Sequence, residues 1–290
     1  MMRMLSLRHW RWLLVVPFVW TAEASAAAFT DAQYAAHIAV LKKKLPGKEF
    51  SIVLEKPFVV VGDLPAGDLR KRWAAGTVRW ATQKLKAAYF KKDPIHILDV
   101  WLFKDKASYE KHAQALWGSK PSTPYGYYSS FNRALVMNIA TGGGTLVHEI
   151  VHPFVEANFP GCPASFNEGL GSLYEQSAER KGQIVGLTNW RLAGLQRVIR
   201  ADKLPSFKAF TAQSDRVFYT SARGNNYAQA RYLCYYLQER GLLRKYYRAF
   251  HANRKTDPTG YSTLIATLGK PDMAAFQKRR EGWVLKLKFP

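Results

Sequence analysis

Short apolar stretches in the first half of the chain give way to longer stretches with helical spacing in the second half. Residues 51–55 and 58–61 are rich in β-branched and aromatic residues, which predicts two strands. The apolar segments 95–103 and 133–139 predict two more. Strands gathered in one half and helices in the other predict an α+β fold.

Apolar residues recur at intervals of three and four over much of the remaining chain, which predicts amphipathic helices. The glycines of 141–145 open one of these helices. The predicted helices cover 64–89, with a break near Gly76, then 106–116, the helix opened at 141–145, and 164–180, 188–202, 226–240, 241–252 and 272–285.

The N-terminus has the order of a secretory signal peptide. Arg3, Arg8 and Arg11 precede the apolar run 12–20, and small residues that include Ala24-Ser25-Ala26 follow it. The alternative, an uncleaved membrane anchor, needs about 20 apolar residues, and this run is far shorter. We therefore predict an exported protein, periplasmic or secreted, with residues 1–26 as the signal peptide and cleavage near Ala26.

Composition narrows the possible partners. Of 290 residues, 48% are hydrophobic, which supports a packed core and excludes a mainly disordered chain. Lysine and arginine exceed the acids by 22, and all but about two of these charges lie beyond residue 26. This excess is compatible with a uniformly solvated basic surface or with an anionic partner such as a wall polymer or a membrane surface. Export argues against a nucleic-acid partner.

One segment carries a metal-binding pattern. Residues 145–152 contain His148-Glu149-Ile150-Val151-His152, and side chains four residues apart lie on one face of a helix. Two imidazoles so placed can share a metal ion, and Glu149 can act as general base on a water that the metal activates. The alternative is a pair of core histidines with hydrogen-bonded neighbours. A catalytic zinc needs a third protein ligand.

Downstream, Asn167-Glu168-Gly169 begins the next predicted helix. With the His-Glu-x-x-His segment, it resembles the gluzincin metallopeptidases, and more closely their exported peptidase-MA-like relatives. The resemblance implies that Zn²⁺ is held by His148, His152 and Glu168. It also implies a glutamate seven residues further on, here Glu175, which can orient a ligand histidine. An ordinary surface acid is the alternative reading of Glu175.

The same resemblance implies a zincin-like fold, in which a small mixed β-sheet packs on the active-site helix and a mostly helical part follows. It places 133–139 as the strand that pairs with an extended peptide. It also implies a tyrosine that stabilises the oxyanion. Tyr227 is the candidate for this role. The alternative reading is that Tyr227 is an ordinary aromatic residue of the core. Other candidate donors are Tyr125, Tyr127 and Tyr128.

Two departures from the gluzincin pattern bear on the site. Pro153 directly follows His152 and disturbs the regular helical hydrogen bonding there. The aminopeptidase branch has a Gly-x-Met-Glu-Asn element upstream, where this chain has Asn138-Ile139-Ala140-Thr141-Gly142. The missing acid favours an endopeptidase over an aminopeptidase.

The sequence therefore predicts an exported zinc metallopeptidase with a peptide or peptide-containing anionic cell-envelope substrate. A catalytically inactive zincin-like binding protein of the envelope is the alternative. Residues 27–130 form an N-terminal α/β part, and 131–290 contain the active-site helices and the helical C-terminal part; the two can also form one domain. Cys162 and Cys234 are the only cysteines, and a disulfide between them is left open.

Overall fold

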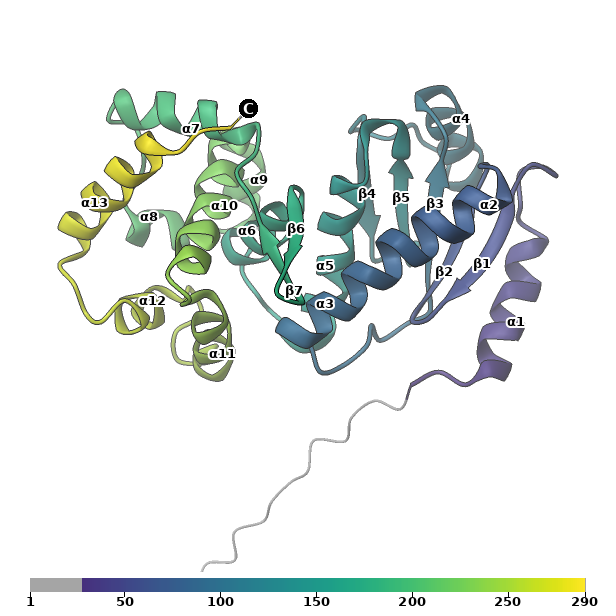
Figure 1. The fold of residues 1–290 in the computed structure, drawn as a ribbon, viewed down its shortest axis with the longest axis horizontal. Coiled ribbons are helices and arrows are strands. Elements are labelled where there is room, and N and C mark those ends of the chain that lie inside the picture. Colours follow the sequence, from purple (N-terminus) through teal and green to yellow (C-terminus); the bar gives the residue numbers. More distant parts are fainter. Residues whose placement is uncertain (1–27, 290) are drawn as a thin grey trace, which may run out of the picture.

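The structure, a computed structural model, describes residues 28–289, so the predicted signal peptide lies outside the described residues. The fold is α+β, with a small mixed sheet at one end and helices at the other (Figure 1). The strands of the sheet are β1 (Ser51–Glu55), β2 (Phe58–Gly62), β3 (Leu98–Phe103), β4 (Gly126–Ser129) and β5 (Ala134–Asn138). Their order is β1-β2-β3-β5-β4.

The central strands of this sheet are parallel and its two edge strands are antiparallel to them. β2, β3 and β5 run in parallel, with Phe58 opposite Leu98 and Asp99 opposite Ala134. β1 and β4 each pair antiparallel with a neighbour. The predicted strand 133–139 is thus β5, and β4 covers its outer side. The expectation that 133–139 pairs with a substrate is wrong, because both edges of β5 are already occupied.

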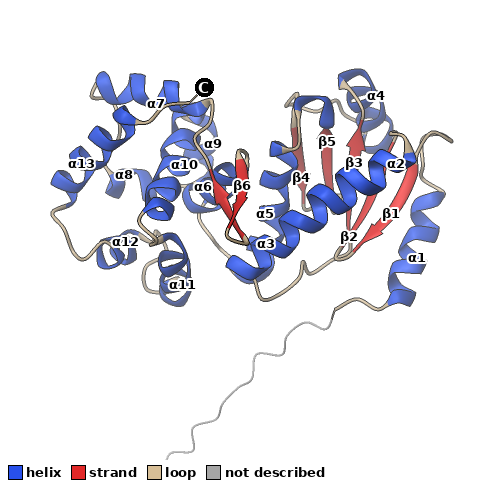
Figure 2. Cartoon of the chain, in the orientation of Figure 1, coloured by secondary structure: helices blue, strands red, loops and turns tan. Residues whose placement is uncertain are grey.

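Helices cover both faces of the sheet (Figure 2). Phe58 and Val60 of β2 belong to one buried cluster, while Val59 and Val61 belong to another, as the alternation of side chains along a strand requires. The first cluster includes residues of α5 (Gly144–Asn158) and of the long helix before β3. The second includes residues of α1 (Asp31–Lys42) and α4 (Lys106–Trp117).

The long helix before β3 is continuous. It consists of α2 (Ala66–Asp68), a π-helical stretch η1 (Leu69–Arg79) and α3 (Trp80–Ala88). The break predicted near Gly76 is therefore absent. Apolar side chains on both sides of this glycine are buried in the core, which holds the two halves on one axis: Leu69, Trp73, Val78 and Leu85.

The second half is helical apart from one hairpin. Helix α6 (Ala164–Tyr174) is followed by strands β6 (Ser177–Arg180) and β7 (Gln183–Gly186), so the helix predicted over 164–180 ends at Tyr174. The remaining elements are a short 3-10 turn η2 (Ile139–Thr141) before α5, and α7 (Arg191–Arg200), α8 (Phe207–Thr211), α9 (Asp215–Thr220), α10 (Arg223–Glu239), α11 (Leu243–Asn253), α12 (Tyr261–Thr267) and α13 (Met273–Lys286).

One buried cluster connects the sheet to the helical half. It contains Val60 of β2, Ile150 of α5, Leu170 of α6 and Phe276 of α13. The boundary predicted between 130 and 131 falls in the turn between β4 and β5, and the division into two parts stays a prediction. Within residues 28–289, no helix combines the length and hydropathy needed to cross a membrane.

Candidate metal centre

Helix α5 carries both histidines of the motif in its buried middle turns. The helix continues through Pro153 to Asn158. The rings of His148 and His152 still converge, with their centroids 4.9 Å apart. The proline therefore does not separate the two imidazoles, and Pro153 itself is buried.

Helix α6 packs against α5 and brings Glu168 to the same point. Two glycines of α6 lie in close contact with the neighbouring helices. A Cβ atom at Gly171 would lie 3.1 Å from the His148 ring, and a Cβ atom at Gly169 would lie 3.0 Å from the Ala230 carbonyl oxygen on α10. The glycines allow α6 to fit between α5 and α10, and this close packing places Glu168 against the histidines.

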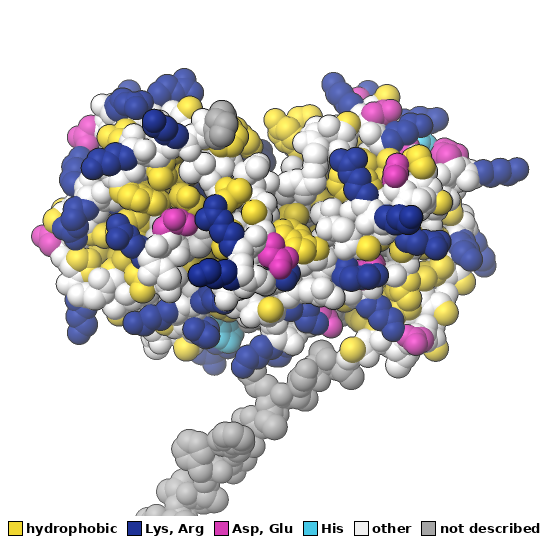
Figure 3. All heavy atoms as spheres, in the orientation of Figure 1, with side chains coloured by type: hydrophobic (Ala, Val, Ile, Leu, Met, Phe, Trp, Pro, Cys, Tyr) yellow, Lys and Arg dark blue, Asp and Glu magenta, His cyan; other side chains and the backbone are white. Residues whose placement is uncertain are grey.

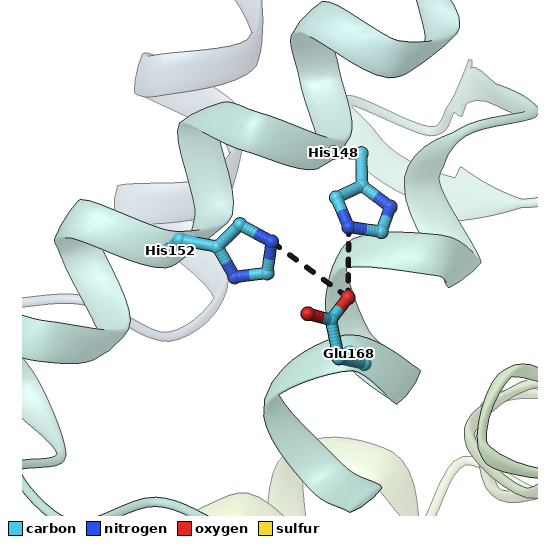
Figure 4. A group of neighbouring side chains, drawn as sticks. All are labelled: His148, His152 and Glu168. Carbon is cyan, nitrogen blue, oxygen red and sulfur yellow. Dashed lines mark hydrogen bonds and ion pairs between the residues drawn. The ribbon is translucent and has the colours of Figure 1, made fainter. Parts of the chain in front are cut away.

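Three side chains form a group that could hold a metal ion: His148, His152 and Glu168 (Figure 4). Their potential ligand atoms lie within 4.8 Å of one another. The Glu168 Oε2 atom is 3.0 Å from His148 Nε2 and 3.8 Å from His152 Nε2. Two imidazole nitrogens and one carboxylate oxygen are a ligand set that zinc and several other divalent metals accept.

Each of the three side chains is also held by a hydrogen bond at the atom that points away from the shared point. His148 Nδ1 lies 3.1 Å from Glu175 Oε1, and His152 Nδ1 lies 3.0 Å from Asn167 Oδ1. Both partners are acceptors, so each Nδ1 donates a hydrogen bond to its partner and each Nε2 atom is directed at the shared point, where it can bind a metal. The second oxygen of Glu168 accepts a hydrogen bond of 2.8 Å from the Tyr219 hydroxyl. Such outer partners are typical of metal-binding histidines and carboxylates.

Glu175 is itself held by the start of the next helix. Arg191 donates to both of its oxygens at 2.7 and 2.9 Å, and Asn189 donates at 3.2 Å. Burial raises the pKa of Glu175, but hydrogen bonds from His148 and Arg191 outweigh burial and lower it to about 2. Glu175 therefore stays ionised and can accept the Nδ1 proton of His148.

Glu149 lies beside the same point and is buried. Its Oε2 atom accepts a hydrogen bond of 3.0 Å from the Tyr128 amide of β4 and lies 3.7 Å from His152 Nε2. Burial raises the pKa of Glu149 and the two histidines partly oppose this rise. A carboxylate whose pKa lies above its usual value is a stronger base, which suits a group that takes a proton from water.

The charge balance at the centre favours a cation. Three carboxylates surround two imidazoles: those of Glu149 and Glu168, which are buried, and that of Glu175, which is partly buried and bonded to Arg191. Burial lowers the pKa of His148, but the carboxylates around it raise this pKa well above the usual value. The site thus attracts positive charge at the Nε2 side, where a divalent metal would replace the proton.

Two tyrosines flank the centre from the helical half. The Tyr227 ring lies 6.4 Å from the His148 ring, and the guanidinium groups of Arg191 and Arg223 lie over its faces at 5.0 and 5.8 Å. Tyr219 instead contacts Glu168 through its hydroxyl. Sequence reasoning missed Tyr219, which lies 51 residues from Glu168. It also missed Arg191, which reaches Glu175 only because the unpredicted β6–β7 hairpin turns the chain back. Asn167 belongs to the Asn-Glu-Gly element, and its contact with His152 was not predicted from the sequence.

The other tyrosines named from the sequence lie around β4. Tyr125 precedes the strand and is exposed, while Tyr127 lies within it and is half-buried. The Tyr128 hydroxyl donates to Glu156 at 2.8 Å, and its amide holds Glu149. Tyr128 therefore acts on the centre through its backbone.

The two cysteines are free thiols, so the structure has no Cys162–Cys234 disulfide. Cys234 lies on α10 against Gly169 of α6. Burial raises the pKa of both thiols. They pack as small apolar groups between the helices, which is common for buried cysteine.

Comparison of the sequence with models of protein families and with curated proteins finds no match.

Proposed function

We propose that the protein is an exported zinc-dependent metallohydrolase, a peptidase of zincin-like fold that resembles the gluzincins. One observation carries this proposal. The Nε2 atoms of His148 and His152 face one carboxylate of Glu168, while their Nδ1 atoms are bonded to outer acceptors. Two histidines with only a structural role in the core would not need to direct both Nε2 atoms at one carboxylate. The α+β arrangement, with α5 packed on the mixed sheet, supports the zincin-like part of the proposal.

The chain supplies distinct groups for binding and for proton transfer. His148, His152 and Glu168 would hold the Zn²⁺, which when bound supplies a Lewis acid that polarises a carbonyl and lowers the pKa of water. Glu149 takes the proton of the attacking water and delivers it to the leaving amine. The hydrogen bond that Glu149 accepts from the Tyr128 amide keeps its carboxylate beside the His152 ring.

Tyr227 is proposed to stabilise the oxyanion. Its hydroxyl is kept protonated because burial raises its pKa above the ordinary value. The Tyr219 hydroxyl is already bonded to Glu168, which leaves Tyr227 as the flanking tyrosine that has no bond to a ligand residue. A single donor of this kind typically contributes about 10²–10³-fold to kcat.

The outer edge of β4 is proposed to align the peptide. The 2.8 Å hydrogen bond from the Asn138 amide to the Tyr125 carbonyl shows which residues along β4 direct their backbone groups toward β5. By the antiparallel alternation, the backbone groups of Gly126 and Tyr128 point away from β5. The Tyr128 amide holds Glu149, so a peptide paired here would lie beside the proposed base. Backbone pairing at a sheet edge is a general mode of peptide binding.

The basic composition supports an anionic envelope polymer with peptide segments as the substrate. Lysine and arginine side chains are spread over the face shown in Figure 3 and outnumber acidic ones there. They would raise the local concentration of a polyanion and accelerate its encounter with the enzyme.

Metal analysis and a peptide screen test the proposal. Purified protein without residues 1–26 is expected to hold about one zinc per chain, and His148→Ala and Glu168→Ala should both lose it. Glu149→Gln should keep the metal and lose turnover on a peptide library. Wild-type protein that stays empty after zinc dialysis would refute the metal site. Full metal with no turnover in any peptide or envelope fraction would leave the envelope binding protein in its place.

A further inference from the structure

A pocket outside the metal centre lies between the end of α10 and helix α13. Its volume is about 360 Å³, within the range of small-ligand sites. Aromatic and aliphatic side chains form its walls, and two arginines complete it. The lining residues are Tyr236, Arg240, Leu242, Leu268, Pro271, Phe276, Arg279 and Trp283. Figure 3 shows apolar side chains exposed over α10 and α13 with lysines and arginines around them.

The positive charge of this pocket is not neutralised by the protein. Arg240 and Arg279 are exposed, and no acidic residue lines the pocket. Within residues 28–289, neither guanidinium has an ion pair or a hydrogen bond to a carboxylate; Arg240 lies instead over the Tyr236 ring, 5.2 Å from its centroid. Two unpaired guanidinium groups at one small pocket favour a ligand with a carboxylate or phosphate.

The aromatic walls form a corner. The rings of Tyr236 and Trp283 are 5.1 Å apart and nearly perpendicular, at 88°, and the Phe276 ring meets Tyr236 edge-on at 5.5 Å. A flat ring could stack on only one of these faces. A puckered sugar ring has C–H groups on its face and on its edge, so it can contact both walls, because the electron-rich face of an aromatic ring attracts C–H edges.

From these features we propose that the pocket binds one acidic sugar residue of an anionic polysaccharide. The sugar ring lies in the corner formed by Tyr236 and Trp283, and its acidic group lies between Arg240 and Arg279. Tyr236 follows Tyr227 by nine residues on α10, which places the pocket about 14 Å along the helix from the tyrosine that flanks the metal centre. The pocket is thus a separate site, which would hold a polymer near the centre without taking part in its chemistry.

A single-stranded nucleic acid is the competing occupant, because bases also stack on aromatic residues near arginines. Binding of a strand requires a groove that follows the backbone and a series of parallel platforms. This pocket has room for a single ring, and the aliphatic residues Leu242, Leu268 and Pro271 line it instead of further aromatic platforms. These features favour the sugar.

Calorimetric titration with trigalacturonate tests the proposal, with its methyl ester as the uncharged matched ligand. Trigalacturonate should bind wild-type protein at least about tenfold more tightly than the ester does, and Arg240→Gln with Arg279→Gln should remove this difference. Trp283→Leu should weaken both ligands. Arg70→Gln with Arg200→Gln removes the same charge from exposed positions elsewhere and should leave binding unchanged. Metal-stripped protein should bind as the untreated protein does, so the result is independent of the proposed peptidase activity.

Three outcomes would overturn this assignment. The first is no binding, or equal binding of the acid and the ester. The second is an equal loss in the Arg70/Arg200 variant, which would mean unspecific attraction to the basic surface. The third is an oligothymidylate that binds more tightly than trigalacturonate and depends on Arg240, Arg279 and Trp283. Thermal melting of each variant separates a lost site from a lost fold.

Discussion

The Nδ1 atom of His148 lies 3.1 Å from the Oε1 atom of Glu175, on the side of the ring opposite to Glu168. The imidazole is thereby held between two carboxylates, that of Glu168 within α6 and that of Glu175 at the C-cap of the same helix. Arg191 in turn fixes Glu175 through two hydrogen bonds. This chain of contacts sets both the tautomer and the orientation of the histidine.

Glu175→Gln should weaken metal binding without unfolding the protein. The amide keeps the size of the side chain but loses the charge that makes His148 a better ligand, and such outer partners typically contribute 10–100-fold to affinity. Competition with a metal chelator would measure the change. Glu179→Gln removes an exposed carboxylate only four residues away, paired with Lys84, and should leave the affinity unchanged. Equal affinities in all three proteins would contradict the role of Glu175.

The glycine at 171 should be required by the metal centre. A Cβ atom there would lie 3.1 Å from the His148 ring, so Gly171→Ala should displace the imidazole and raise the metal dissociation constant about tenfold. Gly194→Ala is the matched control, because Gly194 also lies within a helix but faces open space. That change should stabilise the protein by about 0.5–1 kcal/mol. Thermal melting and chelator competition on both variants separate the helix effect from the contact.

The two tyrosines beside the centre should affect different quantities. Tyr227→Phe is expected to lower kcat about 10²–10³-fold with metal content unchanged, because its hydroxyl acts on the substrate. Tyr219→Phe removes the hydrogen bond to Glu168 and should mainly weaken metal binding. Kinetics on the best peptide from a library, beside zinc content, would distinguish them. A large kcat loss in Tyr219→Phe at full metal content, with Tyr227→Phe unaffected, would reverse the two assignments.

The parts of the fold that were predictable from sequence are those with strong local patterns. β2 is buried throughout, and its run of valines after Phe58 indicated a strand directly. β4 has the sequence Gly-Tyr-Tyr-Ser and was missed, because its strand conformation depends on pairing with β5. The hairpin β6–β7 was missed for the same reason, as its polar residues extended the helical pattern beyond Tyr174.

The candidate site also contains residues that were predictable from sequence and residues that were not. The spacing of His148 and His152 places them on one face of a helix, so the sequence brings these two residues together directly. Glu168 and Glu175 were assigned only because the Asn-Glu-Gly element resembles that of the gluzincins. Tyr219 contacts Glu168 from 51 residues away, and the Tyr128 amide reaches Glu149 from another strand. Contacts of this kind depend on the packing of α9 and β4, and local periodicity contains no information on them.

Removal of the metal should lower thermal stability, because the ligands join α5 to α6. A ligand that binds only the folded state stabilises it by about 4 kcal/mol at a thousandfold excess over its dissociation constant. For a chain of this size, that corresponds to a rise in Tm of about 10 °C. Scanning calorimetry with added zinc and with chelator should show this difference in wild-type protein. His148→Ala should melt at one temperature under both conditions, and a shift of the same size in that variant would mean that zinc acts elsewhere on the protein.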